Sequence, residues 1–117
     1  MENTMTHKMK LHREPFEMIK SGKKTIELRL YDEKRRQISV GDEIEFTRSG
    51  GDERIACRVT SLHIFGSFSE LYAELPLLKC GYTEADISTA APDDMNVYYS
   101  REEQEKYGVV GIELILL

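Results

Sequence analysis

Three side chains that could bind or transform a charged ligand lie close together near the N-terminus. Lys24, Glu27 and Arg29 belong to the run GKKTIELR at residues 22–29. Its apolar residues alternate with polar ones, and successive side chains of a β-strand point to opposite faces. We therefore expect a strand whose apolar side chains enter a core. Glu27 and Arg29 would project from the other face, with Lys24 at the mouth of the strand.

This arrangement has three possible uses. Arg29 with Lys23 or Lys24 could clamp a phosphate, and Glu27 could accept from an exocyclic amine of a base, as carboxylates do from cytosine N4. Alternatively, Lys24 beside a carboxylate in a partly desolvated cleft could take part in proton transfer. In the third use, Glu27 and Arg29 only pair with each other on a solvated face, which is worth about 0–1 kcal/mol.

A second group of candidate residues lies near the C-terminus. Ser100 and Glu103 have the spacing of a capping box, so a helix should begin there. Backbone N–H groups at a helix start favour anions, and an exposed Tyr98 or Tyr99 could stack on a base. The alternative is that one of these tyrosines packs under a neighbouring segment while the other is exposed without a role.

The remaining sequence predicts short strands joined by short helices. Residues 79–96 have weak periodicity and predict a long excursion with one helical turn at most. The expected strands are 6–12, 25–30, 43–47, about 54–64 and 109–116, and the expected helices are 15–21, 68–75 and 101–107.

Most of the links between these strands are too short for parallel crossovers, which need a dozen or more residues. We therefore predict one domain over residues 1–117, mostly β with short helices (α+β), built as a small, bent and mostly antiparallel β-barrel. One core should contain the alternating apolar residues of its strands, namely Ile26, Leu28, Ile44, Phe46, Ile55, Cys57, Val59, Ile112 and Leu114.

The charge distribution is uneven although the net charge is −5. Residues 1–36 carry 10 Lys/Arg against 6 Asp/Glu, a balance of +4, and residues 37–117 carry 6 against 15, a balance of −9. The basic third either forms a patch for a polyanion or is a chance distribution. We expect Lys34-Arg35-Arg36 to form a solvated loop.

Several classes of protein do not fit this sequence. The start lacks the apolar region of a signal peptide, and the apolar run 109–117 is far shorter than the ~20 residues that span a bilayer. Cys57 and Cys80 form no CxxC pair, and the histidines lack metal-ligand spacing. We expect a cytoplasmic protein that binds no metal, cofactor or membrane, with Cys57 as a small core residue.

Three pieces of the chain together resemble the ASCH (activating signal cointegrator homology) family, whose domains are similar in fold to PUA domains. These pieces are Pro15-Phe16 through Gly22-x-Lys24-Thr25-x-Glu27-x-Arg29, then Val40-Gly41-Asp42-x-Ile44-x-Phe46, and finally Tyr98-Tyr99-Ser100, Glu103, Tyr107-Gly108-Val109 and Ile112-Glu113. They cover most of the chain in the family's order.

The resemblance implies a cleft between the barrel and the helices, lined by the polar side chains of residues 24–29, that binds RNA or a modified nucleotide. Together with the arguments from the strand and from the helix start, it predicts that the binding residues are Lys23, Lys24, Glu27, Arg29, Tyr98, Tyr99 and Ser100. It leaves the ligand and the oligomeric state open.

A bacterial branch of this family hydrolyses the acetamide of N4-acetylcytidine with a lysine, a threonine three residues later and a separate glutamate. Lys24 matches that lysine, but Glu27 occupies the threonine position. The alternative to RNA binding is therefore a small-nucleoside amidohydrolase with Lys24 and Glu27 as catalytic residues. A protein-interaction domain that uses the acidic C-terminal two thirds is a third class.

Overall fold

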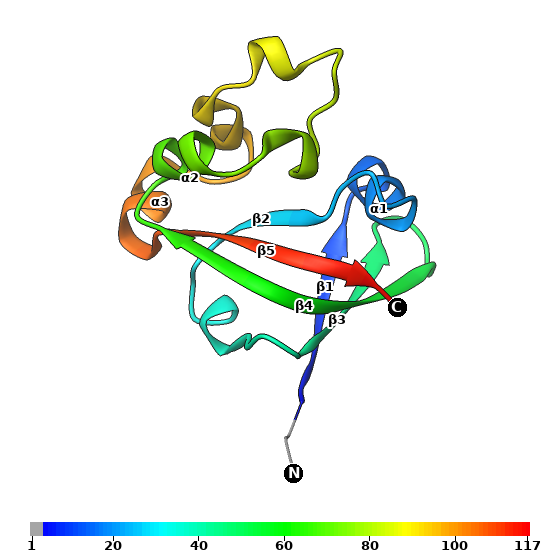
Figure 1. Ribbon diagram of the computed structural model, residues 1–117. Coiled ribbons are helices and arrows are strands. Elements are labelled where there is room, and N and C mark those ends of the chain that lie inside the picture. The colour runs from blue at the N-terminus through cyan, green and yellow to red at the C-terminus, as the bar shows by residue number, and fades with distance from the viewer. Residues whose placement is uncertain (1–3) are drawn as a thin grey trace.

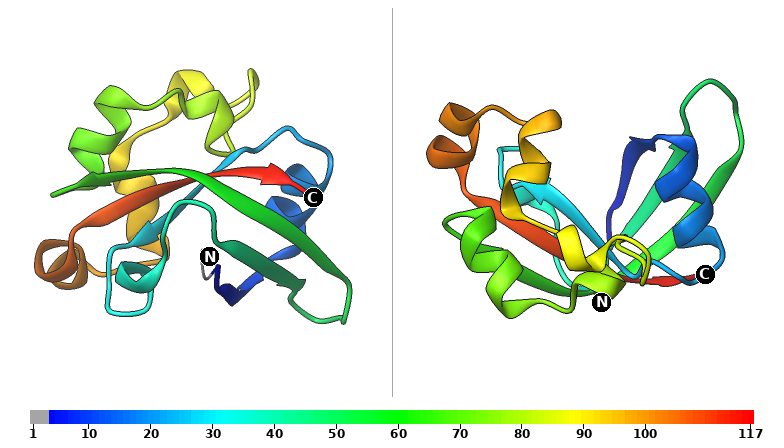
Figure 2. Two further views of the ribbon diagram at one scale, coloured as in Figure 1. Left: turned by 60° about the horizontal axis from the view of Figure 1, so that its bottom comes forward. Right: turned by 90° about the horizontal axis from the view of Figure 1, so that it is seen from above.

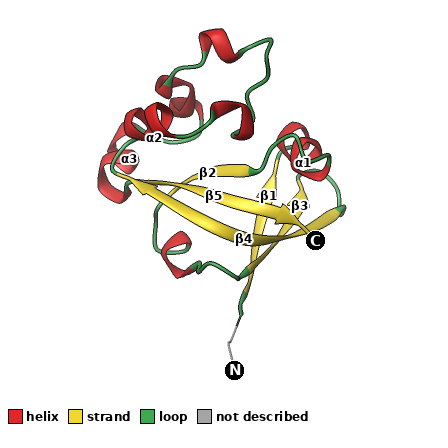
Figure 3. Ribbon diagram, in the orientation of Figure 1, coloured by secondary structure: helices red, strands yellow, loops and turns green. Residues whose placement is uncertain are grey.

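A computed structural model describes residues 4–117, so the first three residues of the N-terminal segment lie outside it. Within this range the chain forms a curled five-stranded sheet with short helices above it (Figures 1 and 3). The elements in chain order are β1 (Thr6–Leu11), α1 (Arg13–Lys20), β2 (Ile26–Leu30), η1 (Arg35–Gln37), β3 (Glu43–Arg48), β4 (Arg54–Phe65), α2 (Phe68–Glu74), η2 (Leu77–Lys79), η3 (Ile87–Thr89), η4 (Pro92–Val97), α3 (Arg101–Tyr107) and β5 (Val109–Leu116).

The strand order is β1-β3-β4-β5-β2, which places the first two strands of the chain at opposite edges of the sheet. The pairs β3–β4, β4–β5 and β5–β2 are antiparallel, whereas β1 and β3 are parallel. The parallel pair is possible because residues 12–42, which include α1 and β2, make a long enough crossover. The predicted fold class, a bent and mostly antiparallel α+β barrel, is confirmed.

Seen from above, the sheet is bent into a V (Figure 2, right). One arm carries β1, β3 and α1, and the other carries β2 and β5. The V opens between the two edge strands, β1 and β2, so the polar residues of β2 lie where the barrel does not close.

The buried apolar side chains of the described residues form two clusters, not the single core that the sequence predicts. Ile44, Phe46, Cys57, Val59, Ile112 and Leu114 belong to the first cluster, against which Ile55 packs. Ile26 and Leu28 belong to the second, together with Phe68 and Leu71 of α2. The reason is that β2 is covered on both faces, and its apolar side chains point toward α2 and the short helices rather than into the curled sheet.

The predicted boundaries hold best where capping residues mark them. The hydroxyl oxygen of Ser67 accepts from the N–H of Glu70, and the box of Ser100 and Glu103 is complete. The last helix and the last strand have the predicted bounds. The helix expected to open at Pro15 begins two residues earlier, at Arg13, because a proline is also tolerated elsewhere in a first turn.

The segment 79–96 is more ordered than its weak periodicity indicates. It contains η3 and most of η4 in addition to the end of η2, where one helical turn was predicted. Pro92 opens η4, and the carboxylate of Asp94 accepts from the N–H of Ala91. Met95 of η4 is buried in the second cluster. Side-chain capping and burial thus order a segment that lacks a helical pattern.

No helix within residues 4–117 is long and apolar enough to cross a membrane. The described residues also contain no group of three His, Cys, Asp or Glu side chains that could hold a metal ion.

Gly111 allows α2 to approach the sheet, because a Cβ there would lie 2.7 Å from Leu75 Cδ1 and 3.2 Å from Ile26 Cγ2. We expect Gly111→Ala to lower the free energy of unfolding by about 1–3 kcal/mol, because it overpacks the second cluster. Urea unfolding followed by circular dichroism measures this change.

The matched control is Gly51→Ala in the β3–β4 hairpin. There a Cβ meets only the flexible end of Arg48, with its nearest atom at 3.2 Å. This variant should stay within about 0.5 kcal/mol of the parent protein. Equal stability of the two variants would contradict the close packing of α2 on β5.

Candidate functional site

The polar residues of β2 face the inside of the curled sheet. Glu27 is paired with Ile112 and Arg29 with Val110 on β5, and both partners belong to the first apolar cluster. The sequence predicted this alternation, with Glu27 and Arg29 on the face opposite the apolar side chains and a cleft lined by them. In the structure they fill the opening between the two edge strands.

Glu27 is the centre of this group, and only 4% of its surface is exposed. Its Oε1 lies 2.7 Å from Lys24 Nζ, and its Oε2 accepts from Arg29 Nε at 2.8 Å. Burial by itself raises the pKa of the carboxyl group, but the two cations and their hydrogen bonds outweigh it. The pKa of Glu27 is therefore lowered, and the residue is ionised.

Arg29 joins the two edges of the sheet. Its Nη2 donates to the backbone carbonyl of Lys10 on β1 at 3.0 Å, while its Nε is held by Glu27. Burial opposes the charge of the guanidinium, but the carboxylate of Glu27 more than compensates, so the pKa of Arg29 is raised. A single side chain thus bridges strands that share no backbone hydrogen bonds.

Lys24 lies at the start of β2 and is buried to a similar extent, with 9% of its surface exposed. The backbone around it is fixed, since the N–H of Lys24 donates to Met18 O and that of Thr25 donates to Lys79 O. Gly81 lies against its side chain with φ +111°, a conformation that favours glycine. This glycine lets the loop after η2 close over the lysine.

These three residues line a cleft of about 620 Å³. The cleft crosses the free edge of β2, because Leu28, from the other face of that strand, also lines it. Its lining combines basic groups with acidic and phenolic ones: Lys10, Lys24 and Arg29 on one hand, and Glu14, Asp86, Asp94, Tyr72 and Tyr82 on the other.

Tyr98 and Tyr99 both line the cleft but differ in burial. The ring of Tyr99 stacks on Phe68, with ring centres 6.2 Å apart and planes 16° apart. Burial raises the pKa of Tyr99 even though Arg29 lowers it. Tyr98 is 62% exposed, so its ring is available to a ligand at the rim.

Two residues predicted for the site do not line the cleft. Lys23 is exposed outside it, although the neighbouring Lys24 is buried. Ser100 accepts from the N–H of Glu103, and the carboxylate of Glu103 accepts from the N–H of Ser100, so the helix start is satisfied internally. Their place in binding stays a prediction that the geometry does not favour.

The sequence interpretation missed several cleft residues. Lys10 and His12 come from β1 and the turn after it, and Tyr72, Tyr82 and Asp94 come from segments far along the chain. The alternation of β1 could have indicated that Lys10 is exposed. No sequence pattern indicates that the loop containing Tyr82 lies beside β2.

The basic run 34–36 is more than the solvated loop that the sequence predicts. The guanidinium of Arg36 lies 4.3 Å from the centre of the Tyr31 ring, and its Nη2 donates to Tyr107 O at 3.1 Å. Arg35 Nη1 donates to Asp32 Oδ2 at 3.3 Å. These contacts tie the loop after β2 to the end of α3.

The two cysteines are unsuited to nucleophilic chemistry. Both are buried, and burial raises the pKa of each thiol to about 11. Cys57 lies in the first apolar cluster, as the sequence predicts, and Cys80 borders the cleft. A thiol that stays protonated at neutral pH is a poor nucleophile.

The structure thus combines a curled five-stranded sheet, short helices over its open edge, and a buried glutamate paired with two cations in that opening. The family model of the ASCH domain matches residues 9–117, and the chain belongs to this family.

Two solved structures are similar over nearly the whole chain. Hypothetical protein PH0355 is 36% identical with a TM-score of 0.80, and the match covers 97% of this chain and 100% of that one. Protein PF0455 from Pyrococcus furiosus is 35% identical with a TM-score of 0.72, covering 97% of this chain and 98% of the other. Comparison with curated proteins finds no match.

The ion pairs of Glu27 with Lys24 and Arg29 predict a specific loss of stability in acid. Because its pKa is lowered in the folded protein, its contribution is present above the ordinary value of 4.5 and is lost as the pH falls through the folded value. We expect Glu27→Gln to lower the free energy of unfolding at pH 7 by about 3 kcal/mol, because it leaves two buried cations without an anion. Urea unfolding between pH 7 and pH 3 measures this loss.

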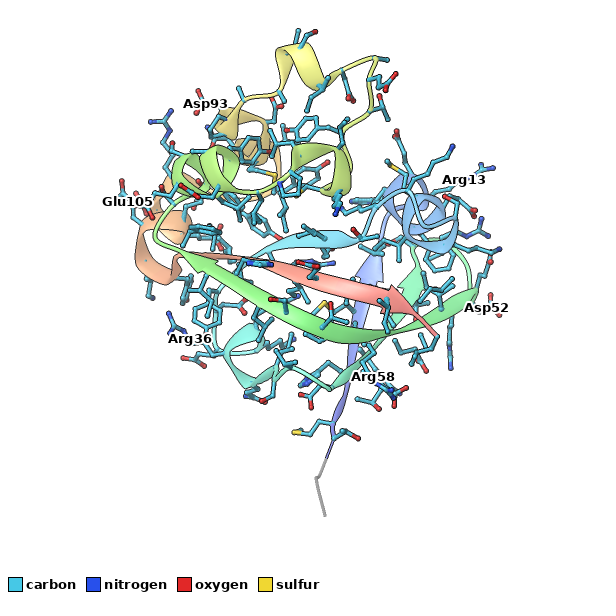
Figure 4. All side chains as sticks on the ribbon, viewed as in Figure 1. Arg13, Arg36, Asp52, Arg58, Asp93 and Glu105 are labelled. Atoms are coloured by element: carbon cyan, nitrogen blue, oxygen red, sulfur yellow. The ribbon has the colours of Figure 1, made fainter. Side chains whose placement is uncertain are left out.

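The difference between parent and variant should shrink as the pH falls. The exposed Glu105, labelled in Figure 4, is the matched control, and Glu105→Gln should stay within about 0.5 kcal/mol of the parent. A constant difference between the Glu27 variant and the parent over this pH range would contradict an ionised, charge-paired Glu27.

Proposed function

We propose that the cleft binds single-stranded RNA or a nucleotide through Lys24 and Arg29. Membership in the ASCH family supports a generic RNA-binding role. The observation that carries the proposal is that one buried carboxylate holds both cations at a cleft without using all of their donors. Such a pair is ready to receive an anion without reorganisation.

The hydrogen-bond inventory of the two cations supports a phosphate as the anion. A guanidinium has five N–H donors and an ammonium has three. Within the described residues, Arg29 uses one donor on Glu27 and one on Lys10 O, and Lys24 uses one on Glu27. The remaining donors match the geometry of phosphate oxygens, which guanidinium groups bind in bidentate fashion.

In this proposal Glu27 positions the two cations and does not read the base. Both of its oxygens are engaged and its surface is almost fully buried. A ligand amine that competed for this carboxylate would have to displace a cation from a buried ion pair, which is costly.

The cleft supports binding better than it supports the amidohydrolase alternative. The threonine position of the bacterial branch is filled here by Glu27, whose lowered pKa also makes it a weak base. Burial raises the pKa of the hydroxyls of Tyr72 and Tyr82, and the thiol of Cys80 has a raised pKa as well. These groups stay protonated near neutral pH, so none of them is an activated nucleophile.

The adjacent residues Lys23 and Lys24 provide the first test of this proposal. We expect Lys24→Ala to weaken binding of a fluorescent single-stranded RNA hexamer at least tenfold, because hydrogen bonds to charged groups contribute about 1.5–3 kcal/mol. Lys23→Ala makes the same change of charge outside the cleft and should have a much smaller effect. Fluorescence anisotropy over a series of salt concentrations measures both variants.

The salt series provides a second readout. The slope of log K against log salt should fall by about 0.7 for each phosphate contact that is removed. We expect this change for Lys24→Ala and not for Lys23→Ala. Equal losses in the two variants would show non-specific attraction and would refute a cleft-specific site.

The exposed ring of Tyr98 predicts a stacking contribution. Stacking of a base on an aromatic side chain is worth about 1–3 kcal/mol by alanine substitution. We expect Tyr98→Ala to weaken the same RNA hexamer by about tenfold or more, whereas Tyr98→Phe keeps the aromatic face and binds like the parent protein. If phenylalanine fails to preserve the affinity, stacking is not the contribution of this residue.

A further inference from the structure

The cleft also contains a chain of hydrogen bonds in which its cationic residues take no part. Tyr82 Oη lies 2.7 Å from Tyr72 Oη and 2.7 Å from Asp94 Oδ2. The three groups come from α2, the loop before η3, and η4, and all of them line the cleft. Figure 1 shows these segments together above the sheet, in green to yellow. We call Tyr72, Tyr82 and Asp94 the tyrosine relay.

The direction of the hydrogen bonds in this relay follows from the carboxylate. An ionised carboxylate only accepts, so the single hydroxyl hydrogen of Tyr82 is donated to Asp94. The bond between the two hydroxyls must then be donated by Tyr72. Both hydroxyls have a raised pKa, first of all because of burial, so both protons are retained near neutral pH.

The relay therefore offers only acceptors to a ligand, since both hydroxyl hydrogens are used internally. Asp94 Oδ2 accepts from Tyr82 and from the N–H of Ala91, whereas Oδ1 has no hydrogen-bond partner among the described residues. The oxygen of Tyr72 keeps its lone pairs. The basic residues of the same cleft, by contrast, offer only donors.

We propose that the tyrosine relay reads the amino group of a base, so that the cleft takes a nucleotide whose base is adenine or cytosine rather than uracil. This inference rests on the proposed function, because Lys24 and Arg29 are taken to hold the phosphate. An exocyclic amine donates to the free lone pairs of the relay. The O4 carbonyl of uracil is an acceptor at the corresponding position and leaves the relay acceptors unpaired, which costs affinity.

This assignment gives base recognition to Asp94 instead of Glu27, for which the sequence had suggested it as one of three possible uses. Glu27 has both oxygens engaged with cations, whereas Asp94 is exposed with one oxygen available. The two carboxylates therefore have different roles. Glu27 fixes the residues that hold the phosphate, and Asp94 accepts from the base.

The test compares single-stranded hexamers of cytidine and uridine, whose bases differ in the group that faces the relay. The parent protein should bind the cytidine hexamer about tenfold more tightly, as expected for one base-edge contact. Asp94→Asn should bring this ratio close to one, because the amide also provides a donor that uracil O4 can use. Asp93→Asn is the matched control, since Asp93 is exposed, lies outside the cleft lining and points outward in Figure 4.

Tyr82→Phe provides a second variant that keeps the charge of Asp94. It removes the link between the two partners and frees the hydroxyl hydrogen of Tyr72 to act as a donor. We expect it to lower the cytidine-to-uridine ratio as well. Thermal unfolding shows whether Asp94→Asn is folded. If it is not, Tyr82→Phe alone tests whether the relay determines the preference for cytidine.

The outcomes separate this inference from the function on which it rests. Binding that depends on Lys24 but is equal for the two hexamers overturns the inference alone. A cytidine preference that both relay variants retain also overturns it. The absence of binding to either hexamer overturns both the inference and the proposed function.

Discussion

The ion triad around Glu27 is the interaction on which the rest of the site depends. A carboxylate that is 4% exposed has lost its hydration and is stable only because Lys24 and Arg29 replace the water. The same contacts fix the positions of both cations. Through the bond from Arg29 to Lys10 O, they also connect the two edges of a sheet that does not close by backbone pairing. One buried charge thus links the shape of the barrel to the position of its binding groups.

The cleft follows from this incomplete closure. If β1 and β2 were paired along their length, as in a closed barrel, the polar face of β2 would be inaccessible. Instead the side chain of Arg29 spans the opening, and the segment from α2 to η4 covers the other side of β2. The resulting cleft has basic groups contributed by residues 10–29 and the tyrosine relay contributed by residues 72–94. A ligand with an anionic part and an amino-bearing part complements both sets.

Structural and binding roles are combined in some of these residues and separate in others. Glu27 and Arg29 hold the sheet edges and the cleft together, so a change at either affects folding as well as binding. Tyr98 and Asp94 are exposed at the cleft, so they report on the ligand more directly. The tyrosine relay connects the elements above β2, because the hydroxyl of Tyr82 accepts from Tyr72 of α2 and donates to Asp94 of η4.

The sequence by itself determined the local features of this protein. Alternation defined β2, capping residues and glycines defined the ends of α3 and the start of β5, and the order of these motifs indicated the ASCH family. Each of these signals acts over a few residues, where backbone geometry and side-chain capping are decisive. The tertiary structure alone decided that β2 is buried on both faces, that Glu27 is enclosed rather than solvated, and that Tyr82 and Asp94 share its cleft. The burial of a side chain depends on how the sheet curls and on which elements cover its edge. The same is true of contacts between residues far apart in the sequence, such as Arg29 and Tyr99, which line the same cleft. The alternation of side chains along a strand is the same whether its polar face meets water or a neighbouring element. A local sequence pattern therefore does not indicate whether that face is exposed or buried.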